Sequence, residues 1–318
     1  MTVNSYVPIY SGDPTQFGRV AVLFGGNSAE RSVSLKSGQH VFEALQSSGV
    51  DAIAIDVGEN ICQQLSDAKF DCAFIALHGG DGEGGKVQAL LDLMGVRYTG
   101  SSCAASALAM NKLHTKKVWL SSGLPTAKFV TVSPDSNFEK VWEDIGDAFV
   151  KPAKEGSSYG VSPAHSLSEL KAAVAHAREF DASVIVESLI DGPEYSVSIL
   201  GNQVLPAIEI INHAEFYDFE AKYVSDKTEY VCPAKVSEQQ ATLMADYALA
   251  AFASLGCSGW GRVDFMADKT GELFLLEVNT VPGMTDHSLV PMAAKAVGLS
   301  YAQLVLEVLA LSKVGDDG

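Results

Sequence analysis

Residues 261–289 read GRVDFMADKTGELFLLEVNTVPGMTDHSL and predict a two-stranded hairpin, a glycine turn and the start of a helix. VDFM and LFLLEVN are strand-like, and the ADKTGE segment between them is rich in turn formers. If the connecting loop holds an even number of residues, Arg262 lies opposite Glu277 and Asp264 lies opposite Leu275. An odd-length loop would split the polar residues of the hairpin between its two faces.

In the even register, the hairpin has one polar and one apolar face. The polar face carries Arg262, Asp264, Glu277 and Asn279. The other face collects core side chains from Val263, Phe265, Phe274, Leu276 and Val278. Carboxylates suit Mg²⁺ that also binds phosphate oxygens, and an adjacent Arg can hold phosphoryl groups. A solvated strand face with ordinary surface charges would show the same pattern.

The chain has 318 residues, which is long enough for two or three domains with a sizeable core. A hydrophobic content of 47% and 28 glycines are typical of an α/β protein with many tight turns. The net charge of -17 argues against a nucleic-acid partner, for which a basic surface is expected. Small anionic ligands remain compatible, because a few clustered Lys and Arg residues reverse the local potential.

The five cysteines are scattered and form no CxxC pair, which indicates reduced cysteines in a cytosolic protein. Residues 1–18 lack the basic and apolar regions of a signal peptide, so we expect a short flexible leader. No apolar run reaches the roughly 18 residues that span a bilayer. These features predict a cytoplasmic protein without a membrane partner.

Residues 19–100 predict an open parallel α/β domain. RVAVLF is a buried-type strand followed by a Gly-Gly turn and a helix, and DAIAIDV and FDCAFIALHG repeat the pattern. Glu30 and His78 each follow a strand and are expected at the ligand-facing edge of the sheet. Taken singly, Glu30 could be a solvated charge and His78 a core histidine. The glycines of HGGDGEGG favour close backbone approach, although no Walker-type GxxxxGK[ST] occurs.

Residues 101–186 change to helices and then to strands that flank a small-residue loop. Lys112 lies on a helix, where a solvated lysine is the alternative to a functional one. Lys151 ends a strand, and EGSSYG at residues 155–160 connects two strands. Such a loop can fold over phosphates and donate N–H and O–H groups, whereas a surface hairpin is the alternative.

Residues 187–318 contain the opening hairpin and two further candidate regions. VIVESLI and PEYSVSIL predict a strand pair, with Glu187 and Glu194 at the two ends of the intervening turn. FYDFEAKYVSDKTEYVCPA is a long loop in which aromatic residues alternate with Lys222 and other charges, which favours a functional loop over a linker.

The sequence resembles the D-alanine-D-alanine ligases of the ATP-grasp superfamily from residue 19 to about residue 311. The resemblance is carried, in order, by LFGGNSAERSVSL, FIALHG, VKPAKEGSSYG, FYDFEAKYVSD, GWGRVDF and LLEVNTVPGMTDHSLVPMAA. It implies an α/β ATP-grasp fold, in which two α+β subdomains grip ATP, preceded by the open parallel N-terminal domain. The expected boundaries are 1–18 for the leader, 19–100 for the N-terminal domain, 101–186 for the central subdomain and 187–318 for the C-terminal subdomain.

The resemblance also implies a nucleotide and metal site. The residues expected at ATP are Lys112, Lys151, Ser157, Glu187, Leu189, Glu194 and Lys222. The lysines would contact the phosphates, the two glutamates would meet the adenine and ribose, and backbone near Leu189 would hydrogen-bond the base. Asp264, Glu277 and Asn279 would hold two Mg²⁺ ions, with Mn²⁺ as a possible substitute.

For the amino acids, the resemblance implies two subsites. Glu30 would bind the ammonium group of the first D-alanine, and Ser288 with Leu289 would bind the carboxylate of the second. Arg262 and the Gly283 N–H would form the oxyanion site. A network of Glu30, Ser157, Tyr223 and His78 would provide a route for the proton of the attacking amine, with the identity of the base left open.

The implied reaction joins two D-alanines through a D-alanyl phosphate, with release of ADP and phosphate, for peptidoglycan precursors. Tyr223 favours an amine as nucleophile, although D-lactate or D-serine remains an alternative acceptor. A homodimer through the first domain is also implied. The sequence departs from the family pattern at Gly84, Asn111, Ser188 and Val281. A regulatory protein on a decayed ligase fold would lack Asp264, Glu277 or Arg262, and all three are present.

Overall fold

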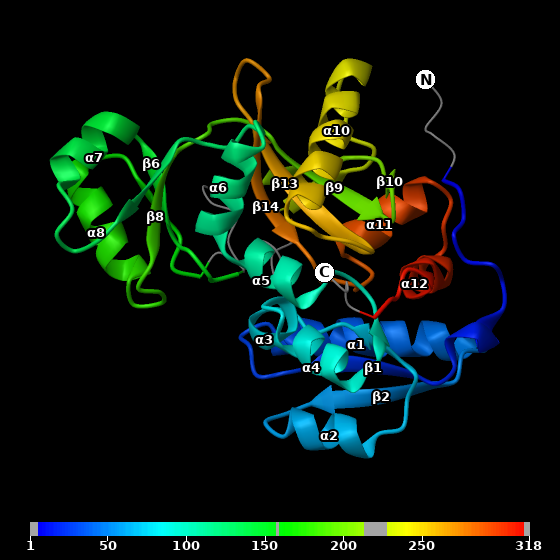
Figure 1. Cartoon of the computed structure of the whole chain (residues 1–318). Helices are drawn as coiled ribbons and strands as arrows, with labels where there is room; N and C mark the ends of the chain where they lie inside the picture. Colours follow the sequence, from blue (N-terminus) through cyan, green and yellow to red (C-terminus); the bar gives the residue numbers. More distant parts are fainter. Residues whose placement is uncertain (1–5, 157–158, 213–227, 315–318) are drawn as a thin grey trace.

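A computed structural model describes residues 6–156, 159–212 and 228–314 of the chain. Within these ranges the strands form three sheets, two of four strands and one of six. Figure 1 shows the first sheet at the bottom, the second in the lobe on the left, and the third in the upper part of the molecule.

The first sheet is parallel, as predicted for the N-terminal domain. Its strands, in order across the sheet, are β2 (Ala52–Val57), β1 (Val20–Gly25), β3 (Cys72–Ile75) and β4 (Arg97–Tyr98). The helices of this part are α1 (Arg31–Ser47), α2 (Ile61–Asp67), α3 (Gly80–Glu83) and α4 (Lys86–Met94). Because parallel strands end at one edge, the turn after β1 and the loop after β3 bring Glu30 and His78 to the same side.

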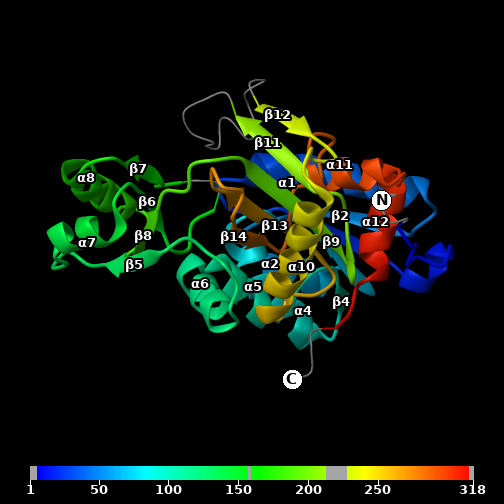
Figure 2. The ribbon, with the colours of Figure 1, turned by 90° about the horizontal axis from the view of Figure 1, so that it is seen from above.

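The second sheet is antiparallel and has a core of its own. Its strands, in order, are β5 (Phe129–Val132), β8 (Val184–Ser188), β6 (Ala148–Pro152) and β7 (Ser162–Ala164). α7 (Phe138–Ile145) and α8 (Leu167–Ala177) pack against it around Val150, Leu170 and Val186. This lobe projects from the rest of the molecule in both Figure 1 and Figure 2.

The third sheet is also antiparallel and contains the hairpin with which the sequence analysis began. Its strands, in order, are β12 (Thr228–Val231), β11 (Ile208–Asn212), β9 (Glu194–Leu200), β13 (Trp260–Ala267) and β14 (Leu273–Asn279), with β10 (Gln203–Val204) paired to β9. β8 and β9 were predicted to pair, and this is wrong, because they belong to different sheets. Residues 189–193 therefore cross from the second sheet to the third.

One face of the third sheet is covered by helices. α10 (Glu238–Ser254) overlies β13 and β9 (Figure 2), and Ala248 and Phe252 pack on Val263 and Phe265. α5 (Cys103–Met110) and α6 (Lys112–Ser121) join the same core, in which Trp119 is fully buried. These two helices fall in the range assigned above to the central subdomain, yet they pack with the third sheet.

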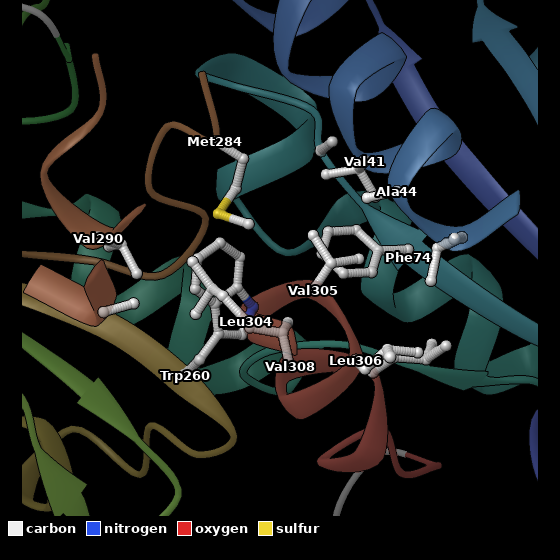
Figure 3. Close-up of a cluster of buried hydrophobic side chains, with 14 of the residues drawn as sticks. Val41, Ala44, Phe74, Trp260, Met284, Val290, Leu304, Val305, Leu306 and Val308 are labelled. Carbon is white, nitrogen blue, oxygen red and sulfur yellow. The ribbon is translucent and has the colours of Figure 1, made fainter. Parts of the chain in front are cut away.

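The opposite face of the third sheet shares a core with the first domain. α11 (Leu289–Ala296) and α12 (Tyr301–Ala310) lie between them, and Figure 3 shows Trp260, Phe74 and Val305 in one cluster. Trp260 comes from the third sheet, Phe74 from the first sheet and Val305 from α12. Among the described residues, no single helix is long and apolar enough to cross a bilayer; α11 and α12 meet the criteria only together, with a bend of 104°.

The described part of the leader, residues 6–18, lies against the body of the protein. Glu307, on α12, is buried and accepts hydrogen bonds from the Tyr6 hydroxyl (2.9 Å), the Ile9 N–H (2.7 Å) and the Tyr10 N–H (3.2 Å). A short 3₁₀ helix, η1 (Pro14–Phe17), follows, and Phe17 is buried in the shared core. A short flexible leader was expected here, because residues 1–18 lack the basic and apolar regions of a signal peptide.

The register of the hairpin differs from the prediction. Arg262 pairs with Asn279, Asp264 with Glu277 and Phe265 with Leu275, and the register shifts between Asp264 and Phe265. The predicted pairs of Arg262 with Glu277 and of Asp264 with Leu275 are therefore wrong. A β-bulge inserts one residue and reverses the alternation beyond it. As a result, the core takes Leu273 and Leu275 in place of the predicted Phe274 and Leu276, with Val263, Phe265 and Val278 as expected.

Candidate active site

A cavity of about 470 Å³ lies where the first domain meets the third sheet. Such a volume is in the range of small-molecule sites. The predicted site residues that line it are Glu30, His78, Lys112, Glu194, Arg262, Asp264, Glu277, Asn279, Gly283, Ser288 and Leu289. Residues far apart in the sequence are thus brought into one pocket, whereas Lys151, Glu187 and Leu189, also expected at ATP, do not line it.

Asp264 is the most strongly held carboxylate of the pocket. It lies on β13, is only 4% exposed, and accepts the Ser196 hydroxyl at 2.7 Å. Arg262 binds both of its oxygens, through Nε at 2.9 Å and Nη2 at 2.7 Å, and Asn279 Nδ2 donates at 2.9 Å. The bidentate contact fixes the guanidinium plane, so Arg262 is oriented by Asp264.

Glu277 lies directly across from Asp264 and is linked to a helix of another part of the chain. Lys112 Nζ is 3.2 Å from Glu277 Oε2 and also donates to the Glu155 carbonyl at 2.8 Å. Lys112 is the first residue of α6 because Asn111 caps that helix, with its side chain accepting the His114 N–H at 3.2 Å. The departure at Asn111 therefore preserves the cap that positions Lys112.

The oxygen atoms of Asp264, Glu277 and Asn279 fit a hard divalent cation. They offer two carboxylates and one amide from adjacent strands. Within the ranges that the structure describes, no three His, Cys, Asp or Glu side chains gather into a group that would hold a metal. This donor set suits Mg²⁺, which is commonly held by one or two carboxylates together with phosphate oxygens.

A second charged cluster surrounds Glu187 on β8, an internal strand of the second sheet. Glu187 is 2% exposed, with Lys151 Nζ at 3.0 Å and Lys116 Nζ at 3.4 Å from its Oε2. Burial favours a higher pKa for Glu187, but the two ammonium groups outweigh it and hold the pKa below its usual value. Glu187 Oε1 is buried and has no hydrogen-bond partner among the described residues. An acceptor of this kind fits a ligand amino group, such as that of adenine.

Lys116 is a site residue that the sequence analysis missed. Its side chain is fully buried on α6, and Nζ donates to the Thr126 hydroxyl. Burial lowers the pKa of Lys116, and the Glu187 carboxylate opposes this. Its position four residues after Lys112, on the same helix face, was the available signal.

Glu194 and Leu189 are two further residues expected at the nucleotide, and the structure places only Glu194 in the cavity. Glu194 lines the cavity, whereas Leu189 follows β8 and its N–H already donates to the Asp147 carbonyl at 2.8 Å. A base near Leu189 would therefore have to use another backbone group of residues 187–190.

Glu30 and Glu83 bring two carboxyl groups to the end of the cavity formed by the first domain. Glu30 is buried just before α1, and Gly156 approaches it so closely that an added Cβ would lie 3.1 Å from Glu30 Oε1. Glu83, which the sequence analysis did not single out, accepts the Gly79 N–H at 3.0 Å. Burial and the neighbouring Glu30 carboxylate raise the pKa of Glu83 above its ordinary value.

His78 lies in the cavity wall with both ring nitrogens engaged. Nδ1 is 2.9 Å from the Val281 carbonyl and Nε2 is 2.9 Å from Ser37 Oγ. Burial lowers the pKa of His78 to about 4. His78 thus lines the cavity, and its expected part in a proton network stays a prediction.

The segment after β14 connects the candidate metal site at Asp264, Glu277 and Asn279 to the N-terminus of α11. Gly283 lies close to Ser288, since an added Cβ would be 2.9 Å from Ser288 Oγ. Ser288 Oγ accepts the Thr285 N–H at 2.9 Å, and Leu289 is the first residue of α11. Helix N-termini favour anions through their free N–H groups and dipole, so this position suits a carboxylate.

Three predicted site residues, Ser157, Lys222 and Tyr223, lie outside the described residues. Their expected roles at the phosphates and in proton transfer stay predictions.

Two family models match the chain. The model described as D-ala D-ala ligase N-terminus matches residues 19–64 and 58–101, and the one described as D-ala D-ala ligase C-terminus matches residues 118–310. Among curated proteins, D-alanine--D-alanine ligase of Saccharophagus degradans is 50% identical over 312 residues, covering 98% of this chain and 99% of the relative. That of Ectopseudomonas mendocina is 51% identical over 299 residues, covering 94% and 96%.

Solved structures of the same family superpose closely. D-alanine--D-alanine ligase from Bacillus anthracis has a TM-score of 0.84 at 32% identity, covering 92% of this chain and 96% of that one. VanG D-Ala:D-Ser ligase from Enterococcus faecalis has a TM-score of 0.82 at 31% identity, covering 93% and 99%. A Bacillus anthracis structure complexed with ATP has a TM-score of 0.82 at 30% identity, covering 92% and 96%. The ATP-grasp fold expected from the sequence is therefore confirmed.

Proposed function

This chain belongs to the D-alanine-D-alanine ligase family, and we propose that it joins two D-alanine molecules into D-alanyl-D-alanine at the expense of ATP. The observation that carries the proposal is the single pocket in which Arg262, Asp264 and Glu277 face Glu30 and the N-terminus of α11. That arrangement supplies sites for phosphate, an ammonium group and a carboxylate in one cavity.

ATP lies between the second and third sheets in this proposal. Asp264, Glu277 and Asn279 would hold Mg²⁺, with Mn²⁺ as a substitute, and two ions are expected from the family resemblance. The bound ions supply positive charge that screens the phosphates from an approaching carboxylate. Lys112 and Lys151 add charge, and the unpartnered Glu187 Oε1 accepts a hydrogen bond from the adenine amino group.

The reaction proceeds in two steps. A carboxylate oxygen of the first D-alanine attacks the γ-phosphorus of ATP, giving D-alanyl phosphate and ADP. The neutral amine of the second D-alanine then attacks the acyl carbon, the C–O bond to phosphate breaks, and inorganic phosphate leaves. Arg262 and the Gly283 N–H stabilise the negative charge on the carbonyl oxygen during this attack.

Binding of the amino acids places these atoms. Glu30 takes the ammonium group of the first D-alanine, and Ser288 with the Leu289 N–H takes the carboxylate of the second. Support comes from the burial of Glu30 and from the position of Leu289 at the start of α11. Ser157, Lys222 and Tyr223 complete the site, and Tyr223 favours an amine acceptor.

The product is a precursor for peptidoglycan, so the proposal places the enzyme in the cytoplasm, where its ATP is available. The family resemblance supports a homodimer formed through the first domain. Light scattering of the purified protein would test it: a molecular mass near twice 33.6 kDa is expected.

The decisive experiment measures ATP-dependent phosphate release with D-alanine, L-alanine, D-serine and D-lactate, and identifies the products by mass spectrometry. Release with D-alanine alone, giving D-alanyl-D-alanine in the presence of Mg²⁺, is expected. Release that requires D-lactate or D-serine as the acceptor would replace the proposed product. Absence of phosphate release with every acceptor would refute the ligase assignment.

A further inference from the structure

The geometry points to His78 and Ser37 as positioning residues that clamp the turn at residues 281–284, with His78 taking no proton during the reaction. The inference rests on the proposed function, in which the Gly283 N–H binds the carbonyl oxygen. It assigns Ser37 a role in the ligase reaction, and it gives His78 a role different from the one expected of it.

The hydrogen-bond pattern determines which nitrogen of His78 carries the proton. The Val281 carbonyl can only accept, so His78 Nδ1 must donate across their 2.9 Å contact. The neutral ring then has an unprotonated Nε2, which accepts the Ser37 O–H at 2.9 Å. Ser37 Oγ in turn accepts the Met284 N–H at 3.1 Å. One chain of hydrogen bonds thus ties Met284 to Val281 through Ser37 and His78.

The surroundings keep His78 neutral. Ser37 is fully buried and His78 is 4% exposed, so the charged ring would be desolvated. The positive charge of Arg262, on β13, also disfavours protonation of the ring and lowers the pKa of His78. Glu30 and Glu83 line the same cavity. Because burial and Arg262 both disfavour the charged ring, the tautomer set by Val281 persists.

The turn is held from its other side as well. The Tyr301 hydroxyl, at the start of α12, donates to the Met284 carbonyl at 2.6 Å. The Met284 side chain points into the shared core near Leu304 and Trp260 (Figure 3), where it is 1% exposed. Met284 is therefore fixed through its N–H, its carbonyl and its side chain.

Gly283 lies between the fixed groups of Val281 and Met284. Its N–H direction follows from theirs, because two anchored peptide groups leave little freedom for the residue between them. A shift of about 1 Å in a catalytic donor can reduce the rate on the order of 10²-fold. Loss of Ser37 or His78 would release one end of the turn and permit such a shift.

The kinetic test compares Ser37→Ala, His78→Asn, His78→Ala and the double variant Ser37→Ala/His78→Ala. Asn carries an N–H near the position of Nδ1 but does not titrate. The clamp predicts that Ser37→Ala and His78→Ala lower kcat on the order of 10²-fold, with KM for ATP unchanged. It also predicts that His78→Asn recovers at least about tenfold over His78→Ala, and that the double variant is no slower than the worse single one. Ser47→Ala, also on α1, bonds only within its own helix and should match the wild type.

Equal loss in His78→Asn and His78→Ala, together with loss of an ionisation from the pH profile of kcat, would make His78 a proton carrier and overturn the clamp. Unchanged kcat in Ser37→Ala would overturn it too.

A measurement that does not depend on turnover tests the clamp separately from the ligase assignment. ¹⁵N NMR of the wild-type His78 ring should show the neutral Nδ1–H form from pH 6 to 8, and a ring that titrates in this range or carries its proton on Nε2 would overturn the clamp. If the wild type released no phosphate with D-alanine, the ligase proposal alone would fail, and the NMR result would still decide the clamp.

Discussion

Glu277 is the residue at which the expected charge chemistry can be tested most directly. Glu277→Gln keeps the shape of the side chain but removes one of the two carboxylates proposed to bind Mg²⁺ and the anionic partner of Lys112. We expect turnover to fall at least on the order of 10²-fold to 10³-fold, as for loss of other transition-state charge stabilisation, with an unchanged far-ultraviolet circular dichroism spectrum. Glu272→Gln, in the exposed turn of the same hairpin, is the matched control. Near-normal phosphate release by Glu277→Gln would remove Glu277 from the metal site.

Lys116 tests the energetics of the buried cluster. Lys116→Met keeps most of the side-chain volume but leaves Glu187 with Lys151 as its remaining cation. Removal of one partner of a buried ion pair should cost roughly 3 kcal/mol. Urea denaturation should show this loss, while Lys117→Met, which is exposed one residue further on α6, should change the free energy of unfolding by less than about 0.5 kcal/mol. Equal stabilities of the two variants would contradict the prediction.

At this scale, sequence patterns identified the residues whose position follows from local geometry. Arg262 and Asp264 share a face of β13, as Glu277 and Asn279 share a face of β14, because alternate residues of a strand point the same way. Lys116 was missed because its burial comes from the packing of α6 with the third sheet and from its contact with Glu187, whereas a lysine on a helix is ordinarily solvated. The tautomer of His78 also depends on Val281 and Ser37, which are far from it in the sequence.

At the scale of elements, the contact of the leader with α12 is open to experiment. Deletion of residues 1–10 would remove the three donors of Glu307 and leave a buried carboxylate unsatisfied, which should cost about 2 kcal/mol. Urea denaturation of the truncated protein would measure this loss. Deletion of residues 1–5 removes none of these contacts and serves as the control. Recovery of stability in the longer deletion by Glu307→Met would confirm the cause, and an unchanged midpoint in that deletion would rule it out.

Element boundaries were largely predictable, whereas their pairing was not. The sequence alone predicts helices at residues 32–47, 137–145 and 237–255, which agree closely with α1, α7 and α10, because helical periodicity and the caps of α7 and α10 are local signals. The bulge after Asp264 and the separation of β8 from β9 arise from contacts between strands. No short sequence window contains those contacts.

For the whole molecule, tyrosine ionisation sets an alkaline limit on stability. Burial, followed by the nearby Asp286 and Glu43 carboxylates, raises the pKa of Tyr301 above its ordinary value of 10.0. The unfolded chain therefore releases this proton first, so stability is complete below pH 10 and falls above it. The slope for this group is up to about 1.4 kcal/mol per pH unit. Denaturation of Tyr301→Phe between pH 9 and 11 should show a smaller slope than the wild type, and equal slopes would exclude this contribution.

The arrangement of the three sheets was anticipated only in outline. The family resemblance implied an N-terminal domain and two further subdomains, and the fold class is confirmed. The resemblance could not show that α5 and α6 pack with the third sheet, because the sequence of an amphipathic helix does not specify which sheet it packs against.

The core shared by Phe74, Trp260 and Val305 also has a consequence for slow fluctuations. Because β1, β13 and α12 all contribute to it, their amides should exchange with deuterium through one cooperative opening and show similar protection. The second sheet has its own core around Val150 and Val186, so β6 and β8 should exchange through a separate, less costly opening. Hydrogen-exchange mass spectrometry would then resolve two cooperative units, and a nucleotide at the proposed site between them would stabilise both.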